Sequence, residues 1–173
     1  MLNIFLTNLG KYNEGEIVGE WVELPITEEE LDAVKERIGI NERYEEMFIS
    51  DYETDIDGLT VGEYDSIQEL NDLAEAIENA DADAIAALIY EGYYTAEEIV
   101  EKLDDVYYIG QRDRYGNMSL DEFIGYYLIE DVGVLDIPEE LQPYFNYEAY
   151  GRDARLNGNF YETSSGKIYE IIK

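Results

Sequence analysis

Carboxylates are the most abundant side chains in this sequence that could carry chemistry. The 173 residues include 42 Asp and Glu but no Cys and no His. A thiolate nucleophile, a Cys-based zinc or iron–sulfur site and an imidazole general base are therefore excluded. Paired carboxylates can hydrolyse glycosides without His, but among so many acids some pairs reach a suitable separation by chance. We expect neither an enzyme nor a bound cofactor.

Two stretches imitate calcium-binding loops. The first matches positions one, three, five and six of an EF-hand loop with Glu53, Asp55, Asp57 and Gly58. Its twelfth position, where a bidentate Glu is required, is Tyr64, and Glu63 comes one residue early. The second, residues 113–117, is followed by Met118 where the sharp turn requires Gly, and it has Ile124 at position twelve. The prediction for both is an acidic loop without a metal ion.

The overall charge indicates the class of partner. The formal net charge is -31 and the pI is about 4.1, so the chain should avoid nucleic acids and anionic membranes and bind a basic partner. Apolar residues make up 46% of the sequence, which is enough to fold a core. The longest apolar run, Ala84 to Tyr90, is far shorter than the roughly 20 residues of a membrane helix, and Met1 to Tyr12 lacks the basic start of a secretion signal. We expect a cytoplasmic protein.

The charge is distributed unevenly along the chain. Residues 44–101 contain 18 Asp and Glu and no Lys or Arg, and residues 115–151 also lack cations. Because like charges repel, selection for stability alone would place Lys among these acids. The pattern therefore indicates that the negative charge is itself functional. Residues 141–173 differ, since four acids there balance four bases, and we expect this segment to mediate self-association.

The elements that must position these acids are predicted from local signals. Four hydroxyl residues, each followed three residues later by Glu, mark helix starts: Thr27, Ser66, Thr95 and Ser119. The first helix should end near Arg37, before Gly39, and a shorter apolar-rich helix is expected over residues 83–90. A turn over residues 10–15 and another over Ser164–Gly166 should join neighbouring strands. Strands are predicted at residues 3–7, 16–24, 46–52, 105–109, 159–162 and 168–172.

This order of elements favours an α+β fold over a wound parallel sheet, because strands flank a helical centre instead of alternating with helices. Three small modules are predicted. Residues 1–61 form a mixed β/α module, residues 62–103 a helical module, and residues 104–173 a mixed α/β module.

The helix that begins at Ser66 carries a ladder of acids on the side away from its apolar residues: Asp65, Glu69, Asp72, Glu75 and Glu78. B-DNA carries one charge per about 1.7 Å, so a net charge of this size corresponds to roughly 50 Å of duplex. We predict a surface that imitates the charge of DNA. It comprises Glu45, Glu46, Asp51, Glu53, Asp55, Asp57, Glu63, Asp65, Glu69, Asp72, Glu75, Glu78, Asp81, Asp83, Glu91, Glu97, Glu101, Asp104, Asp121, Glu122, Glu130 and Asp131.

Several segments in a fixed order resemble the ArdA antirestriction proteins of mobile genetic elements such as conjugative transposons: Leu6–Glu16, Gly19–Trp21, Ser50–Glu53, Ser66–Asn71 and Leu141–Asp153. The last segment resembles the antirestriction motif of that family. The resemblance implies a non-catalytic, elongated and dimeric mimic of duplex DNA. It also implies that the partner is a type I restriction–modification enzyme, whose specificity and methyltransferase subunits form the DNA-binding groove, and that restriction and modification are both blocked.

The C-terminal segment combines the motif with a candidate dimer interface, formed by Leu141, Tyr144, Phe145, Tyr147, Glu148, Tyr150, Gly151, Arg152 and Asp153. Its aromatic residues suit an interface or the core of the C-terminal module equally well. Arg152 is expected to pair with Asp153 or Glu148. Two alternative functions stay open at this point: an acidic calcium- or cation-binding protein, and an acidic chaperone of a basic protein.

Overall fold

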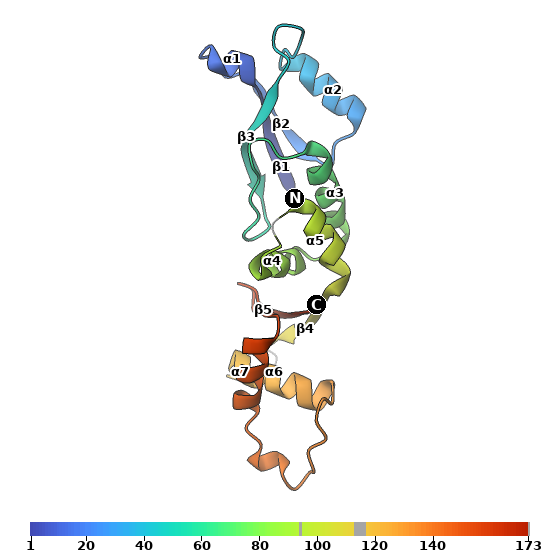
Figure 1. The fold of residues 1–173 in the computed structure, drawn as a ribbon, viewed down its shortest axis with the longest axis vertical. Coiled ribbons are helices and arrows are strands. Elements are labelled where there is room, and N and C mark those ends of the chain that lie inside the picture. Colours follow the sequence, from blue (N-terminus) through green and yellow to red (C-terminus); the bar gives the residue numbers. More distant parts are fainter. Residues whose placement is uncertain (94, 113–116, 173) are drawn as a thin grey trace. The chain divides into compact units, whose positions relative to one another are not determined.

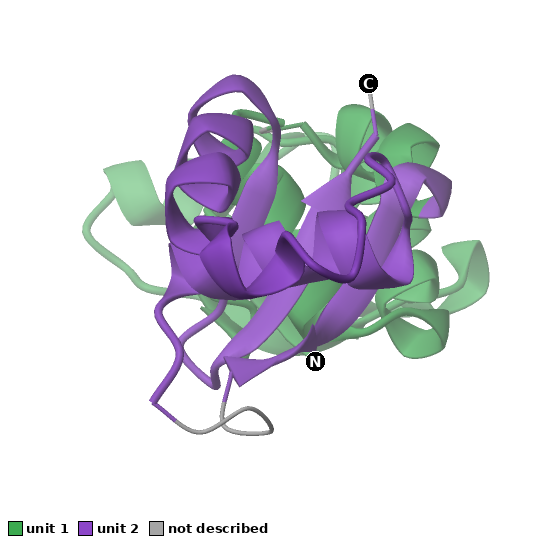
Figure 2. Cartoon of the chain, turned by 90° about the horizontal axis from the view of Figure 1, so that it is seen from below, with its two compact units in different colours: residues 1–103 green, residues 104–173 purple. Residues whose placement is uncertain are grey.

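The computed structural model describes residues 1–93, 95–112 and 117–172. The chain forms two compact units, residues 1–103 (unit 1) and residues 104–173 (unit 2), which Figure 2 shows in separate colours. Each unit combines helices with a three-stranded antiparallel sheet, which confirms the predicted α+β class. The further division of unit 1 between residues 61 and 62 stays a prediction.

The sheet of unit 1 has the strand order β2–β1–β3 (Figure 1). Its strands are β1 (Leu2–Asn8), β2 (Gly19–Leu24) and β3 (Met47–Thr54). One face of the sheet packs on the core, because alternate residues of β1 are almost fully buried: Leu2, Ile4 and Leu6. The residues between them, Asn3 and Phe5, belong to the opposite face and are partly exposed.

Helices begin at all four predicted N-caps. They are α2 (Glu28–Arg37), α3 (Ile67–Asn79), α5 (Ala96–Lys102) and α6 (Leu120–Tyr126). Each hydroxyl accepts a bond from the backbone N–H of the Glu three residues later, and at Thr27 and Thr95 the Glu carboxylate also accepts from the N–H of the cap residue. The apolar-rich helix is α4 (Ala82–Glu91), which ends at Gly92 in the left-handed conformation.

The connection between β1 and β2 differs from the predicted turn. It contains a short helix, α1 (Leu9–Asn13), and β2 begins three residues later than expected, at Gly19. The cause is Asn8, which is completely buried. Its Oδ1 accepts from the N–H of Lys11 at 3.0 Å and caps α1, while its Nδ2 donates to the Ile38 carbonyl at 3.1 Å. A long-range contact therefore fixes this local structure.

The sheet of unit 2 has the order β4–β6–β5, and a single-turn 3₁₀ helix at Leu103–Asp105 leads into it. Its strands are β4 (Val106–Gln111), β5 (Phe160–Glu162) and β6 (Lys167–Ile171). The hairpin predicted for the last two strands is confirmed. Phe123, Ile124 and Ile168 are buried together and form the centre of this unit.

Unit 2 also contains elements that the sequence did not predict. α6 continues into a π-helical turn (Tyr127–Asp131), a 3₁₀ turn covers Gln142–Tyr144, and α7 spans Tyr147–Asn157. The segment predicted only as an association region is thus largely helical. Asn146 caps α7 without a Glu three residues later, and Gly151 lies inside the helix, so the two usual sequence signals are missing.

The tight contact between α6 and α7 explains why a glycine, Gly151, lies inside α7. A Cβ atom there would overlap the Asp121 carbonyl oxygen of α6, and a Cβ at Gly125 would overlap the Tyr147 carbonyl oxygen of α7. The two helix backbones therefore touch, and each glycine provides the space for the other helix.

Candidate functional site

The acids of α3 form a continuous exposed face. Leu70, Leu73 and Ala74 are buried on the opposite side, whereas all five residues of the ladder are exposed. Asp65 lies just before the helix, where its carboxylate accepts from the Gly62 N–H at 2.7 Å. The ladder thus presents one carboxylate per helical turn or more, because positions three and four apart share a face.

α5 packs against α3 and widens this acidic face. A shallow groove of about 300 Å³ between the two helices is lined by Glu69 and Asp72 from α3 and by Glu97, Val100 and Glu101 from α5. Its four carboxylates come from two helices that the sequence could not place side by side. Together they form an anionic cluster of the kind that a basic side chain of a partner would neutralise.

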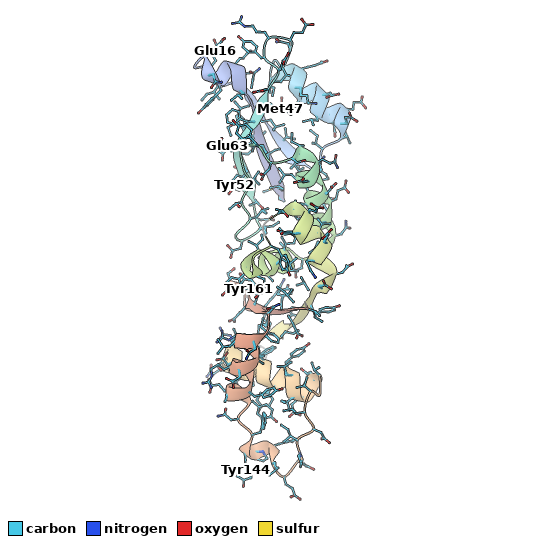
Figure 3. The ribbon with its side chains drawn as sticks, in the orientation of Figure 1. Glu16, Met47, Tyr52, Glu63, Tyr144 and Tyr161 are labelled. Atoms are coloured by element: carbon cyan, nitrogen blue, oxygen red, sulfur yellow. The ribbon has the colours of Figure 1, made fainter. Side chains whose placement is uncertain are left out.

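A second group of acids lies along β3. Asp51 and Glu53 alternate with the half-buried Tyr52 and are exposed, and Asp51 lies opposite Phe5 of β1. The chain at Glu63 runs beside the strand, since the Ile49 N–H donates to the Glu63 carbonyl at 2.9 Å (Figure 3). Glu45, Glu46, Asp55 and Asp57 are also exposed at the ends of this strand. Both secondary-structure types in unit 1 therefore display acids.

The C-terminal segment separates its aromatic residues. Tyr144 is 85% exposed on the 3₁₀ turn (Figure 3), whereas Tyr147 is only 8% exposed. Tyr147 stacks on Tyr126 with ring centroids 3.9 Å apart, and its hydroxyl donates to Glu130 at 2.5 Å. Phe145 contacts Tyr147 edge-on at 5.0 Å. Within this segment, core packing accounts for Tyr147, while Tyr144 is free to contact a partner.

The family comparison agrees with the order of the motifs. The model of the antirestriction protein family ArdA matches residues 4–169. The chain belongs to this family. A search of curated proteins found no match.

ArdA membership implies an antirestriction function for the chain. Within the motif, the structure gives three residues distinct settings. Gly151 allows α6 and α7 to touch. Arg152 lies 3.6 Å from Asp153 in an exposed pair, which is one of the two predicted pairings. Glu148 instead accepts from the Ser119 hydroxyl at 3.1 Å.

The structure distinguishes among the 22 acids predicted for the mimic surface. Eighteen are exposed, whereas four are half-buried: Asp83, Glu91, Asp121 and Glu122. Asp121 pairs with Arg155 at 2.6 Å, so its charge is compensated inside unit 2. Glu130 accepts the short bond from Tyr147. Asp121 therefore contributes less to an anionic surface than the exposed acids of α3, α5 and β3.

Two tyrosines of unit 2 have perturbed acidity. Burial, together with the Glu170 carboxylate 3.1 Å from its hydroxyl, raises the pKa of Tyr127 to about 12. The hydrogen bond to Glu130 raises the pKa of Tyr147 to about 12. In both cases a nearby carboxylate disfavours the phenolate, so each tyrosine stays neutral and donates to a carboxylate that keeps its charge.

Trp21 is a surface residue that the prediction of the acidic site did not include. It is 44% exposed and contacts the Phe5 ring in a tilted arrangement with ring centroids 5.3 Å apart. Glu23, two residues later on β2, is exposed on the same face of the sheet. The alternation of buried and exposed residues along β2 is the sequence signal that would have found this pair.

The described residues contain no group of three or more carboxylates arranged to hold a metal ion. The first calcium-like loop, Glu53 to Gly58, lies within this range, whereas residues 113–116 of the second are outside the described residues. No described helix combines the length and the apolar character needed to cross a bilayer.

Proposed function

We propose that this antirestriction protein is an acidic mimic of duplex DNA that occupies the DNA-binding groove of a type I restriction–modification enzyme. The specificity and methyltransferase subunits form that groove, so occupation blocks restriction and modification together. The chain acts by binding, without catalysis and without a cofactor.

The exposure of the cation-free stretch carries the proposal. Sixteen of the 18 acids in residues 44–101 are exposed, and that stretch contains no Lys or Arg that could neutralise them. An ordinary solvated surface intersperses both signs of charge. A DNA-binding groove is lined by Lys and Arg that normally contact phosphates, and exposed carboxylates supply the same charge.

The proposed active form is a homodimer that joins through the C-terminal segment. Like charges across an interface cost free energy, so the charge-balanced residues 141–173 are the favourable place for contact. Leu141 and Tyr144 support this assignment, because they are large, exposed and apolar, at 55% and 85% exposure. A two-fold dimer would double the length of the acidic surface.

A competition experiment tests the proposal. A purified type I enzyme is bound to a labelled duplex that contains its recognition sequence, and the full chain is added. We expect the chain to displace the labelled duplex, and a higher concentration of the same labelled duplex to restore its binding. Inhibition that persists unchanged at saturating duplex would contradict mimicry, because a mimic and DNA exclude each other.

Salt dependence provides a second measurement in the same assay. Exposed charge pairs are screened within about 10 Å at 0.1 M salt. Binding of the chain to the enzyme should therefore weaken steeply between low salt and roughly 0.5 M. Affinity that stays flat over this range would exclude electrostatic mimicry as the mechanism.

A further inference from the structure

β2 is an edge strand of the unit 1 sheet, because β1 is the only described strand that pairs with it. The Asn8 N–H donates to the Val18 carbonyl at 2.9 Å. In an antiparallel ladder both backbone groups of a residue point to the same side, and the side alternates along the strand. Even-numbered residues of β2 therefore face β1. Gly19, Trp21 and Glu23 direct their N–H and C=O groups toward the open edge.

A groove of about 480 Å³ lies along this edge, between β2 and α2. Four acids line it: Glu20, Glu23, Glu30 and Glu78. Arg37 is the one cation among its lining residues, and it is held by Glu20 in a two-bond pair with both distances 2.8 Å. The groove therefore has an excess of negative charge, while Val22 and Leu24 contribute apolar surface.

The structure already contains a short imitation of strand pairing beyond the end of β2. The side-chain amide of Asn71 accepts from the Ile26 N–H at 2.9 Å and donates to the Ile26 carbonyl at 2.8 Å. These are the two bonds that a residue of a neighbouring strand would make. A side chain thus satisfies the backbone at Ile26, while the edge at Trp21 and Glu23 stays open to a peptide.

We propose that the open edge of β2 binds an extended, Lys- or Arg-bearing segment of the protein partner as a fourth strand. Main-chain bonds to Trp21 and Glu23 would fix its register. Its side chains would alternate between the outer face, where Trp21 offers a cation–π contact, and the acidic groove beside α2. The proposal rests on the proposed function only for the basic character of the partner. The occupant is assigned by charge complementarity between its Lys or Arg side chains and the acids of the groove.

The first test uses a synthetic peptide and the full chain. The probe is a capped Arg-Val-Arg-Val-Arg-Val peptide, and the control is the same peptide with every backbone nitrogen methylated, which keeps the charge but removes the N–H donors. Fluorescence reports the site directly, because Trp21 is the only Trp. At about 0.15 M salt we expect a saturable change with the probe and at least about tenfold weaker binding of the control. Equal binding, or no fluorescence change, would overturn the proposal.

The second test separates the backbone donor from the charge at Glu23. Glu23→Gln removes the charge and keeps the N–H, whereas Glu23→Pro removes both, and an edge N–H that points away from β1 is not needed by the sheet. We expect Glu23→Pro to bind the probe about tenfold more weakly than Glu23→Gln. Equal affinities would contradict strand addition, and so would a change of oligomeric state in Glu23→Pro alone, which would assign the edge to a second copy.

Hydrogen exchange of the unsubstituted chain keeps the test decisive if Glu23→Pro does not fold. The probe should protect the Trp21 and Glu23 amides selectively, and unprotected amides would refute strand addition. Failure of the proposed function has a different signature, because DNA would then not compete with the chain for the enzyme while the probe still bound β2.

Discussion

Units 1 and 2 treat negative charge in opposite ways. Unit 1 contains 28 Asp and Glu against five Lys and Arg, whereas unit 2 contains 14 against six. In unit 1, ion pairs such as Arg37–Glu20 and Arg43–Glu14 lie before residue 44. In unit 2, Arg155 and Arg112 pair with the partly buried Asp121 and Glu162. Most acids of unit 1 after residue 43 are exposed, while unit 2 pairs several of its acids with its own arginines.

Tyrosine hydroxyls bond carboxylates in both units, as Tyr44 does with Glu14 at 2.8 Å in unit 1. In unit 2, Tyr127 and Tyr147 donate to the half-buried Glu170 and the exposed Glu130, so neutral donors hold these two carboxylates. The comparison shows that acid content alone does not define an interaction surface. A carboxylate that already pairs with a cation of the same chain gains less from a basic partner than an exposed carboxylate without such a cation.

The largest expected effect separates the two tyrosines of the motif. Tyr147→Ala removes a buried ring that stacks on Tyr126, and we expect unit 2 to lose about 3–5 kcal/mol of unfolding free energy. Tyr144→Ala, the matched control on the exposed turn, should change stability by less than about 0.5 kcal/mol and shift sedimentation toward monomer. Near-ultraviolet circular dichroism during denaturant unfolding measures the first effect. Equal stability of the two variants would remove the distinction between core and interface.

The next effect concerns the groove between α3 and α5. Replacing Glu69, Asp72, Glu97 and Glu101 by the corresponding amides should weaken binding to the restriction enzyme by about 2–3 kcal/mol, since each exposed charge contributes up to about 1 kcal/mol. The matched control neutralises the same number of exposed acids outside the predicted surface: Glu28, Glu29, Glu36 and Glu42. Enzyme-binding titrations compare the two variants. Equal losses would mean that net charge, and not a defined surface, determines binding.

Alkaline pH should affect unit 2 through its tyrosines. The folded-state pKa values of Tyr127 and Tyr147, about 12, exceed the ordinary value of 10.0. Their contribution to stability is therefore complete below about pH 10 and is lost as the pH rises toward 12. Glu130→Gln removes the acceptor carboxylate of Tyr147 and should lower the pKa of that residue. Ultraviolet titration of tyrosinate absorbance checks this, and a titration identical to that of the unsubstituted chain would argue against the Glu130 contact.

The smallest effect is expected from a single acid. Glu75→Gln neutralises one exposed carboxylate of the α3 ladder and should cost about 1 kcal/mol or less in binding, because many other screened contacts persist. Isothermal titration against the same enzyme measures the difference. Complete loss of inhibition from this one change would indicate a discrete site instead of a distributed surface.

Local signals in the sequence determined much of the fold. Each capping hydroxyl, such as Thr27 or Ser66, specifies a helix start because its bonding partner lies three residues away. The terminal hairpin was predictable from the turn at Ser164–Gly166, and the α+β class from the order of the predicted elements. The exposure of the α3 ladder also followed from helical periodicity, since Leu70 and Leu73 define the buried face.

Other features were decided only by tertiary structure. α1 depends on the buried Asn8, which bonds to the distant Ile38, and α7 tolerates Gly151 because α6 packs against it there. The proximity of Glu69 to Glu97 requires two helices to meet. Packing also decides that Tyr147 is buried while Tyr144 is exposed, and that Asp121 pairs with Arg155. Such contacts join residues far apart in the chain, so residue types and spacing alone do not encode them in readable form.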